Sequence, residues 1–213
     1  MRYQIYSPTS YYKTIEPGKW GRGTNDGVNH PSHLYAIRKY VQPRWSLLDV
    51  GCGSGTTYEA IKNAKLDILY KGIDNDKDYI DWCFKTFPET SWDVQDGTSL
   101  KENDQSWDVV FSRGTIENLP SFELCMREWT RVARKFIIIW FWKGLREGDH
   151  SVQRFIYNNT LYPEFANTYG VEGIKTDMKK FPDWKIVELN TTTLPGVPFG
   201  FHCLVVGKIC LFK

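Results

Sequence analysis

The sequence predicts an α/β fold of three layers, in which helices cover a mostly parallel seven-stranded sheet that ends in an antiparallel hairpin. Through the middle of the chain, short apolar runs alternate with stretches of helical period, which is the order that produces a parallel sheet covered by helices. Near the C-terminus, two strand-like runs are joined by a segment rich in Thr, Pro and Gly. That segment has no room for a crossover helix, so the two runs should pair antiparallel.

Seven segments have the composition of strands. The five predicted parallel strands are residues 46–50, 68–74, 91–95, 107–112 and 136–142. The last of these holds the longest apolar run, FIIIWFW, which is far shorter than the roughly 20 residues needed to cross a bilayer. The predicted hairpin pairs residues 184–190 with residues 203–212.

Helices are predicted between these strands. Residues 31–41 begin at a proline, which suits the first turn of a helix, and residues 76–87 open with acidic side chains, which suit a helix N-terminus. Apolar residues in 121–133 recur at three- and four-residue spacings and form one stripe. The other predicted helices are residues 55–64, residues 151–170 with a break at Pro163, and a short piece that precedes Pro182.

The length of 213 residues predicts a single domain over residues 1–213. We divide it into four parts. They are an N-terminal lead-in with a capping helix (1–42), a ligand-binding core (43–142), a helical insert on the substrate side (143–183) and the terminal hairpin (184–213). The aromatic-rich lead-in is expected to fold over a site.

Composition narrows the class of protein. The 27 basic and 25 acidic residues nearly cancel, which argues against a nucleic-acid or membrane partner. The five cysteines are scattered and contain no CxxC pair, so we expect neither a disulfide framework nor a metal site. The start of the chain lacks a continuous apolar core of signal-peptide length. We therefore expect a cytoplasmic protein; its oligomeric state is left open.

The stretch LLDVGCGSG places glycines at 51, 53 and 55 directly after the first strand. A glycine-rich turn between a strand and its helix lets backbone N–H groups face a ligand at the crevice of an open parallel sheet. The dinucleotide fingerprint GxGxxG would need glycine at position 56, where this chain has Thr56. Asp74 ends the second strand, where it is placed to accept hydrogen bonds from both hydroxyls of a ribose. Asp96 follows the third strand, so the acids suit a ligand with a nucleoside and a cationic centre.

Four segments in order resemble the class I S-adenosylmethionine-dependent methyltransferases. They are LLDVGCGSG, the acid of GIDND, VQDGTSL and WDVVFSRGTIENL. The resemblance covers about residues 34–213 and implies a Rossmann-like fold with S-adenosylmethionine as cofactor.

The resemblance also implies where the cofactor binds. Asp49, Gly51 and Gly53 would surround its amino-acid end, with Cys52 in the same turn as a small filler rather than a nucleophile. Asp74 would hold the ribose.

The remaining cofactor contacts follow the next strands. Asn75 would lie beside the adenine, and Asp96 and Gly97 would hold its edge. Ser112 and Arg113, which leave the fourth strand, would line the methionyl portion.

Methyl transfer depends mainly on placing the acceptor in line with the methyl and the sulfur, and a base is optional. The candidate general bases are His150, His30 and Glu117, with His33 beside them in the lead-in. His202, between the final strands, is the least suited.

The acceptor is expected to be a small molecule, methylated at O or N by direct in-line displacement. The motif after the fourth strand is SRGT rather than (Asn/Asp/Ser)-Pro-Pro-(Tyr/Phe), which gives no support for amino methylation of nucleic-acid bases. The alternatives are a non-catalytic module that binds S-adenosylmethionine or activates a partner, and a nicotinamide-dependent oxidoreductase. The latter is disfavoured by Thr56 and the terminal hairpin.

Overall fold

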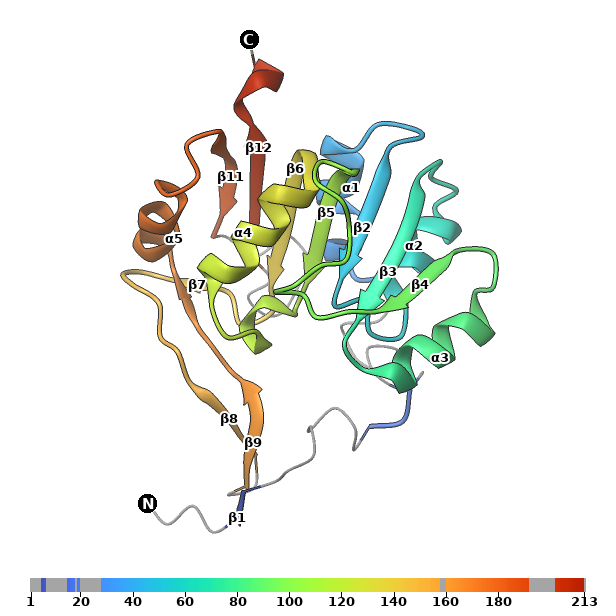
Figure 1. Ribbon diagram of the computed structural model, residues 1–213, viewed down its shortest axis with the longest axis horizontal. Helices are drawn as coiled ribbons and strands as arrows, with labels where there is room; N and C mark the ends of the chain where they lie inside the picture. The colour runs from blue at the N-terminus through green and yellow to red at the C-terminus, as the bar shows by residue number, and fades with distance from the viewer. Residues whose placement is uncertain are drawn as a thin grey trace.

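The computed structural model describes residues 5–6, 15–17, 19, 28–157, 160–191 and 202–212. Its centre is a seven-stranded sheet with the order β11-β12-β6-β5-β2-β3-β4 (Figure 1). The strands are β2 (Ser46–Val50), β3 (Leu69–Asp74), β4 (Ser91–Val94), β5 (Trp107–Arg113), β6 (Ala133–Phe141), β11 (Trp184–Asn190) and β12 (His202–Lys208). The five strands β2 to β6 pair in parallel, as predicted.

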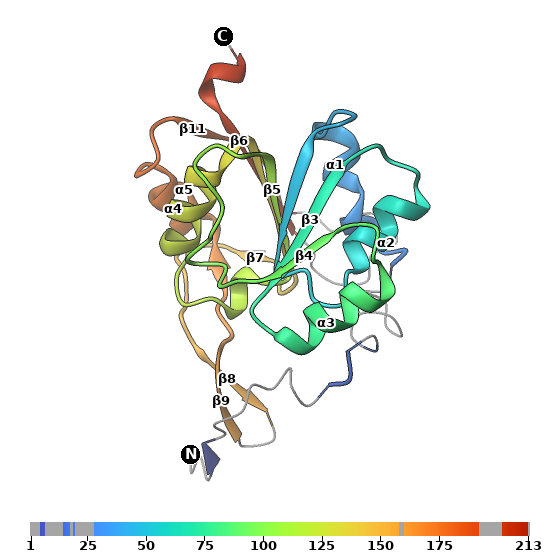
Figure 2. The same ribbon diagram turned by 45° about the vertical axis from the view of Figure 1, so that its right-hand side comes forward.

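The helices form the two outer layers (Figure 2). Helices α1 (Tyr35–Tyr40), α2 (Thr56–Asn63) and α3 (Lys77–Thr86) cover one face of the sheet, and α4 (Phe122–Val132) and α5 (Val171–Met178) cover the other. Short 3₁₀ helices are η2 (Pro31–His33), η3 (Ile116–Asn118) and η4 (Ile209–Phe212). This arrangement confirms the predicted fold class.

The strands bury side chains on both faces because both faces carry helices. Leu47 packs in the hydrophobic cluster under α1 to α3, and the next residue, Leu48, packs in the cluster under α4 and α5. Ile138 and Ile137 alternate in the same way on β6. The two-residue period of a strand therefore divides the apolar runs between two cores.

The predicted stripe on residues 121–133 forms α4. Ser121 caps the helix, because its side chain accepts a hydrogen bond from the N–H of Leu124. The stripe residues Phe122, Cys125, Met126, Trp129 and Val132 are all buried.

The terminal hairpin is also confirmed. Strand β11 pairs antiparallel with β12, and β12 pairs antiparallel with β6. The predicted second strand, 203–212, ends earlier than expected, because residues 209–212 form η4. Residues 192–201, the loop of the hairpin, lie outside the described residues.

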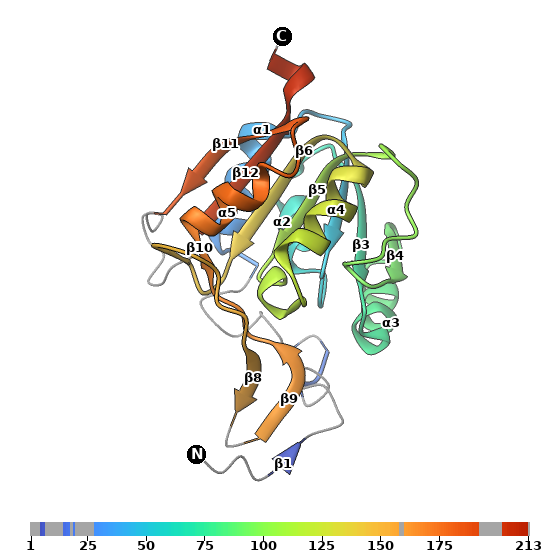
Figure 3. The same cartoon turned by 60° about the vertical axis from the view of Figure 1, so that its left-hand side comes forward.

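The predicted helix over residues 151–170 is wrong, and with it much of the helical character assigned to the insert 143–183. The segment forms β8 (Arg154–Tyr157) and β9 (Thr160–Phe165), which pair antiparallel. Phe155, Ile156 and Tyr157 on one side of an Asn pair, and Thr160 and Leu161 on the other, favour strands over a helix. In Figure 3 this hairpin extends beyond the end of the sheet at which the parallel strands finish.

Strand β1 (Ile5–Tyr6) pairs in parallel with β9 at Thr160 and Leu161. Pro163 lies beyond that pairing, where its missing N–H costs no hydrogen bond with β1. After the hairpin, β10 (Tyr169–Gly170) pairs with β7 (Leu145–Arg146), and α5 follows as the helical piece predicted before Pro182. Most of the lead-in, at residues 1–4, 7–14, 18 and 20–27, lies outside the described residues.

Candidate functional site

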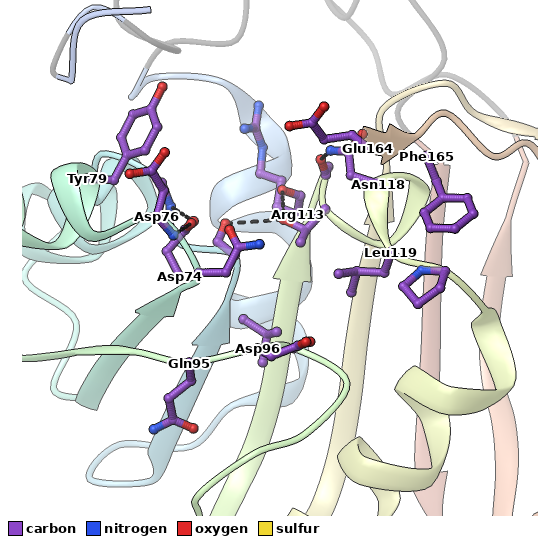
Figure 4. A pocket seen from close by; sticks show the side chains of 18 of the residues that line it. Asp74, Asp76, Tyr79, Gln95, Asp96, Arg113, Asn118, Leu119, Glu164 and Phe165 are labelled. Carbon is purple, nitrogen blue, oxygen red and sulfur yellow. Dashed lines mark hydrogen bonds between the residues drawn. The ribbon is translucent and has the colours of Figure 1, made fainter. Parts of the chain in front are cut away.

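A cavity of about 420 Å³ opens where the parallel strands end (Figure 4). Residues that follow β2, β3, β4 and β5 line it, together with residues of η3 and β9. Its volume falls in the range of roughly 300–1,000 Å³ that is usual for small-molecule sites. Seven of the predicted cofactor residues line it: Gly51, Gly53, Asp74, Asn75, Asp96, Gly97 and Arg113.

The glycine turn after β2 is shaped first by its own packing. The N–H groups of Gly51 and Cys52 both donate to the carbonyl of Ile73, at 2.8 and 2.9 Å. Gly51 has a φ of +76°, and a Cβ built on it would lie 2.1 Å from Thr115 Oγ1. Glycine is thus required there because the loop after β5 lies directly against the turn.

Asp74 lies at the junction of the turn and the second strand. Its Oδ2 accepts from the N–H of Gly53 at 2.9 Å, and its Oδ1 accepts from the N–H of Asp76 at 3.0 Å (Figure 4). Burial raises the pKa of Asp74, and these backbone donors oppose that rise. A carboxylate has about four acceptor positions, so Asp74 retains capacity for the hydroxyls of a ligand in the cavity that it lines.

Asp49 lies behind the cavity wall. Its carboxyl is only 1% exposed and accepts a hydrogen bond of 2.6 Å from the hydroxyl of Tyr70. Burial raises the pKa of Asp49 to about 7, against the opposing hydrogen bonds of Tyr70 and Thr57. This acid therefore supports β2 and the turn from within the core.

Cys52 and Ser112 also support the wall without lining it. Cys52 is buried in the cluster beneath α1 to α3, and burial raises the pKa of its thiol, which suits an inert filler. Ser112 is buried, and its hydroxyl donates to the carbonyl of Val50 at 3.0 Å. That bond ties the end of β5 to the end of β2.

The turn after β4 presents Asp96 and Gly97 to the cavity. Asp96 Oδ1 accepts from the N–H of Thr98 at 2.8 Å and from its hydroxyl at 2.7 Å, so this carboxylate also closes its own turn. The carbonyl of Gly97 accepts from Trp129 Nε1 at 2.9 Å, which fixes the turn to α4. The turn is thus a rigid edge of the site.

Arg113 is the basic residue among those that line the cavity, and buried polar groups of the lead-in hold it. Its Nε donates to Ser32 Oγ at 2.6 Å, and Ser32 Oγ lies 2.6 Å from His30 Nδ1. The N–H of Ser32 also donates to His30 Nδ1, at 3.2 Å, which caps η2. Because Nδ1 accepts that bond, the chain of donors runs from Arg113 through Ser32 to His30. His30 does not line the cavity and is linked to it through Ser32 and Arg113.

The other predicted bases do not line the cavity. His150 Nδ1 accepts from the N–H of Gly170 at 3.2 Å, so Nε2 carries the proton and lies 3.2 Å from Asp177 Oδ2. Burial lowers the pKa of His150, whose ring packs against Phe122 and Tyr169. This histidine fixes the segment after β7 onto α5.

His33 and His202 are likewise engaged elsewhere. His33 is fully buried, with Nδ1 3.0 Å from Thr57 Oγ1. His202 Nδ1 accepts from the N–H of Leu145 at 2.7 Å, and burial lowers its pKa.

Glu117 directly precedes Asn118, which lines the cavity, but the Glu117 side chain itself is buried in the protein. It is 1% exposed, and burial raises its pKa to about 7. Its Oε1 accepts from the N–H of Lys143 at 3.3 Å, whereas its Oε2 has no hydrogen-bond partner among the residues described. The Lys143 ammonium, whose own pKa is lowered by burial, donates to the carbonyl of Ala166. Glu117 and Lys143 thus join η3 to the base of the β8–β9 hairpin.

Among the lining residues that the sequence analysis did not predict are Tyr79, Asn118, Glu164 and Phe165. Tyr79 is 4% exposed, and its hydroxyl has no hydrogen-bond partner in the part of the chain that the structure describes. Glu164 and Phe165 belong to β9, within the segment predicted as helix. The β-forming composition of that segment was the available signal for a second wall. Among the described residues, no group of His, Cys, Asp or Glu side chains is placed to hold a metal ion, and no helix has the length and apolar character to span a membrane.

Residues 48–139 match the family model of the methyltransferase domain. That span contains the glycine turn, Asp74, Asp96 and Arg113. The matched span is 92 of the 213 residues, and it corresponds to a methyltransferase domain.

Solved structures share the methyltransferase fold at low sequence identity. A S-adenosylmethionine-dependent methyltransferase from Methanosarcina mazei is 15% identical with a TM-score of 0.65, and the match covers 81% of this chain and 96% of that chain. A protein from Pyrococcus horikoshii OT3 is 16% identical with a TM-score of 0.67, covering 93% and 97%. A structure from Haloferax volcanii, a complex between the Trm112 methyltransferase activator and a methyltransferase, matches at 13% identity and a TM-score of 0.68, covering 95% and 99%. No curated protein sequence matches the chain.

The cavity fits the cofactor of the methyltransferase family. Asp74 retains acceptor capacity at the place where a ribose would lie. Tyr79 lines the same cavity, and its buried hydroxyl lacks a hydrogen-bond partner within the described ranges. The charged lining residues are four acids (Asp74, Asp76, Asp96, Glu164) and one base (Arg113), which gives 1 − 4 = −3. A negative lining complements a cationic sulfonium.

Proposed function

We propose that this methyltransferase transfers a methyl group from S-adenosylmethionine to an oxygen or nitrogen of a small-molecule acceptor by direct in-line displacement. The observation that carries the proposal is the shared cavity. One side of it is lined by the strand ends that bear Asp74 and Asp96, and the other by η3 and β9. A cofactor on the first side leaves the second side to an acceptor.

Within this proposal, the lining residues hold the cofactor as follows. Asp74 accepts from the ribose hydroxyls, Asn75, Asp96 and Gly97 border the adenine, and Arg113 binds the methionyl carboxylate. When bound, the cofactor supplies an electrophilic methyl group on a sulfonium sulfur. Gly51 and Gly53 border the amino-acid end, while Asp49, Cys52 and Ser112 keep the turn in place from behind.

The chain's own contribution to rate is placement and the exclusion of water. The walls are tied to one another at short range, since Ser112 binds the end of β2, Trp129 binds the turn after β4, and Asn167 Nδ2 donates to the carbonyl of Leu119 at 2.8 Å. None of His30, Glu117 and His150 lines the cavity. The proposed reaction therefore proceeds without any of these three acting directly on the acceptor.

Charge supports a small molecule over a nucleic acid. The lining carries three more acids than bases, so a polyphosphate backbone would be repelled at the mouth of the site. The free thiols of all five cysteines are in keeping with the proposed location in a reducing cytoplasm.

Calorimetric titration with S-adenosylhomocysteine, followed by incubation with methyl-labelled S-adenosylmethionine and a broad acceptor panel, tests the proposal. We expect binding and a labelled product. Folded protein that does not bind S-adenosylhomocysteine would refute the function, and an absorbance change with nicotinamide cofactors would favour the oxidoreductase.

Binding without transfer to any acceptor would favour the other alternative, a cofactor-binding module or a subunit that works with a partner. The Haloferax volcanii methyltransferase is described in complex with an activator. Mixing experiments with candidate partner proteins would then follow.

A further inference from the structure

The side of the cavity formed by η3 and β9 has a chemistry that selects among acceptors. We propose that the acceptor is an amine, that its nitrogen is bound by Glu164 and Asn118, and that Phe165 contacts its apolar part. This inference rests on the proposed methyltransferase function. It concerns a wall that the sequence motifs do not include, because Glu164 and Phe165 come from the β8–β9 hairpin.

Two acceptor oxygens on this wall have no donor. Glu164 Oε2 and Asn118 Oδ1 are both buried and lack a hydrogen-bond partner among the described residues. Leaving a buried polar oxygen unpaired costs about 1–3 kcal/mol, so such groups in native proteins usually mark a site completed by a ligand or water. A ligand that relieves both oxygens must bring N–H or O–H donors.

Charge narrows the donor to nitrogen. The cavity lining sums to −3, as counted above, and Glu164 is the acid on the η3–β9 side. A carboxylate or phosphate on the acceptor would meet this field unfavourably, and a neutral hydroxyl could donate a hydrogen bond but would lack the attraction between opposite charges. An amine, which binds as an ammonium or as a polarised neutral group, is stabilised by Glu164 in both forms.

The wall is held rigidly enough to select a ligand. Asn167 N–H donates to the carbonyl of Glu117 at 2.8 Å, Asn167 Nδ2 donates to that of Leu119, and the Lys143 ammonium donates to that of Ala166. These bonds tie the end of β9 to η3. Arg154 of β8 fixes β9 through two contacts. Its Nη1 donates to the Pro163 carbonyl at 2.6 Å, and its guanidinium lies 4.1 Å from the centroid of the Phe165 ring.

The direction of the side chains completes the arrangement. In Figure 4, the Glu164 carboxylate points across the cavity toward the side where Arg113 lies, and the Phe165 ring faces Leu119. Both residues line the cavity, and their side chains point in different directions from β9. An acceptor with an amine on an apolar body matches this wall.

The proposed step balances without a further reactant. An acceptor bound as an ammonium first passes a proton to the Glu164 carboxylate or to water. The lone pair of the neutral amine then forms the N–CH₃ bond as the S–CH₃ bond breaks, which leaves a neutral thioether and a methylated ammonium. The carboxylate also offsets the positive charge that develops on nitrogen.

The experiment compares matched acceptors on the full chain. Methyl-labelled S-adenosylmethionine is offered with three sets: aliphatic and benzylic amines, the alcohols of the same shapes, and the carboxylates of the same shapes. We expect label in amines only. Label in an alcohol or a carboxylate, or no label in any amine, overturns the inference.

Variants then test the role of Glu164. For the best amine, Glu164→Gln should raise KM about ten- to hundredfold, the effect of losing a hydrogen bond to a charged group, while the affinity for S-adenosylhomocysteine stays unchanged. Glu147→Gln is the matched control, because Glu147 is an exposed glutamate that does not line the cavity. An unchanged KM in Glu164→Gln overturns the assignment.

A separate measurement distinguishes the acceptor role from a cofactor role. If Glu164 instead held the sulfonium, Glu164→Gln would weaken binding of S-adenosylmethionine but not of S-adenosylhomocysteine, whose sulfur is neutral. That result overturns the amine assignment. Loss of S-adenosylhomocysteine binding by the unaltered chain would refute the proposed function itself, whereas binding with a preference for alcohols or acids would refute only the amine.

Discussion

Asp74 provides the sharpest test of the cofactor site, and Asp74→Ala is the perturbation. The carboxylate makes two protein hydrogen bonds, at 2.9 Å to the N–H of Gly53 and at 3.0 Å to that of Asp76, and has acceptor capacity left for a ribose. A hydrogen bond to a charged group contributes about 1.5–3 kcal/mol. Counting only one such bond to the ligand gives a loss of affinity of about 10- to 150-fold.

The assay is calorimetric titration with S-adenosylhomocysteine, after a thermal melt has established that the variant is folded. The melt matters because Asp74 also ties the glycine turn to the start of α3, where Asp76 is the cap residue. Asp78→Ala is the control, since Asp78 is an exposed acid in the first turn of the same helix and does not line the cavity. Folded Asp74→Ala protein with the affinity of the unaltered chain would refute the assignment of the ribose to this residue.

Three further predictions concern stability and positioning. Glu117→Gln should leave stability unchanged near pH 4.5 and raise it by up to about 3 kcal/mol at pH 8, because the pKa of Glu117 lies at about 7 in the folded state and at 4.5 as reference. The destabilisation caused by burying the charged carboxylate of Glu117 therefore appears only as the pH rises from about 4.5 to about 7. A difference in denaturation midpoint between the variant and the unaltered chain that stays the same at every pH would contradict this prediction. Gly51→Ala should destabilise the fold by about 3 kcal/mol or more, since its Cβ would lie 2.6 Å from the Cβ of Thr115. Gly148 is the control, because it has a similar φ of +80° and a Cβ built on it would have nothing within 4 Å. Gly148→Ala should therefore destabilise the fold by only about 1–2 kcal/mol, the cost of the left-handed backbone. Equal urea midpoints for these two variants would count against the close packing of the turn. His30→Ala should weaken S-adenosylhomocysteine binding about two- to tenfold, because Arg113 loses the support of His30 through Ser32. His30→Asn retains an acceptor for the cap of η2 and should recover part of the lost affinity. Identical affinities of the two variants and the unaltered chain in the titration would show that this contact does not affect the ligand.

The order of elements was readable from local patterns. Short apolar runs predicted the parallel strands, and the three- and four-residue stripe predicted α4 and its buried side. The hairpin of β8 and β9 was missed because its strands are stabilised by pairing with each other and with β1, which lies far away in the sequence. The sequence pattern around Pro163 was interpreted instead as a broken helix. Strand formation depends on such cross-strand contacts more than helix formation does.

The candidate site divides in the same way. Asp49 and Asp74 both lie near the end of a parallel strand, and the sequence motifs alone predict that both contact the ligand. The structure separates them, because Asp74 is the last residue of β3 and lines the cavity, whereas Asp49 precedes the last residue of β2 and is buried against Tyr70. Since side chains alternate along a strand, one position decides between the cavity and the core.

The sequence by itself determined the class of fold, the glycine turn and the acid at the end of the second strand, because each depends on residues close together along the chain. Only the tertiary structure decided that His150 and Glu117 are packed away from the cavity and that Glu164 and Phe165 form its second wall. A cavity is defined by side chains that meet from separate elements. The pairing and packing of the whole chain decide where these side chains meet, and the spacing of residues along the sequence does not predict it.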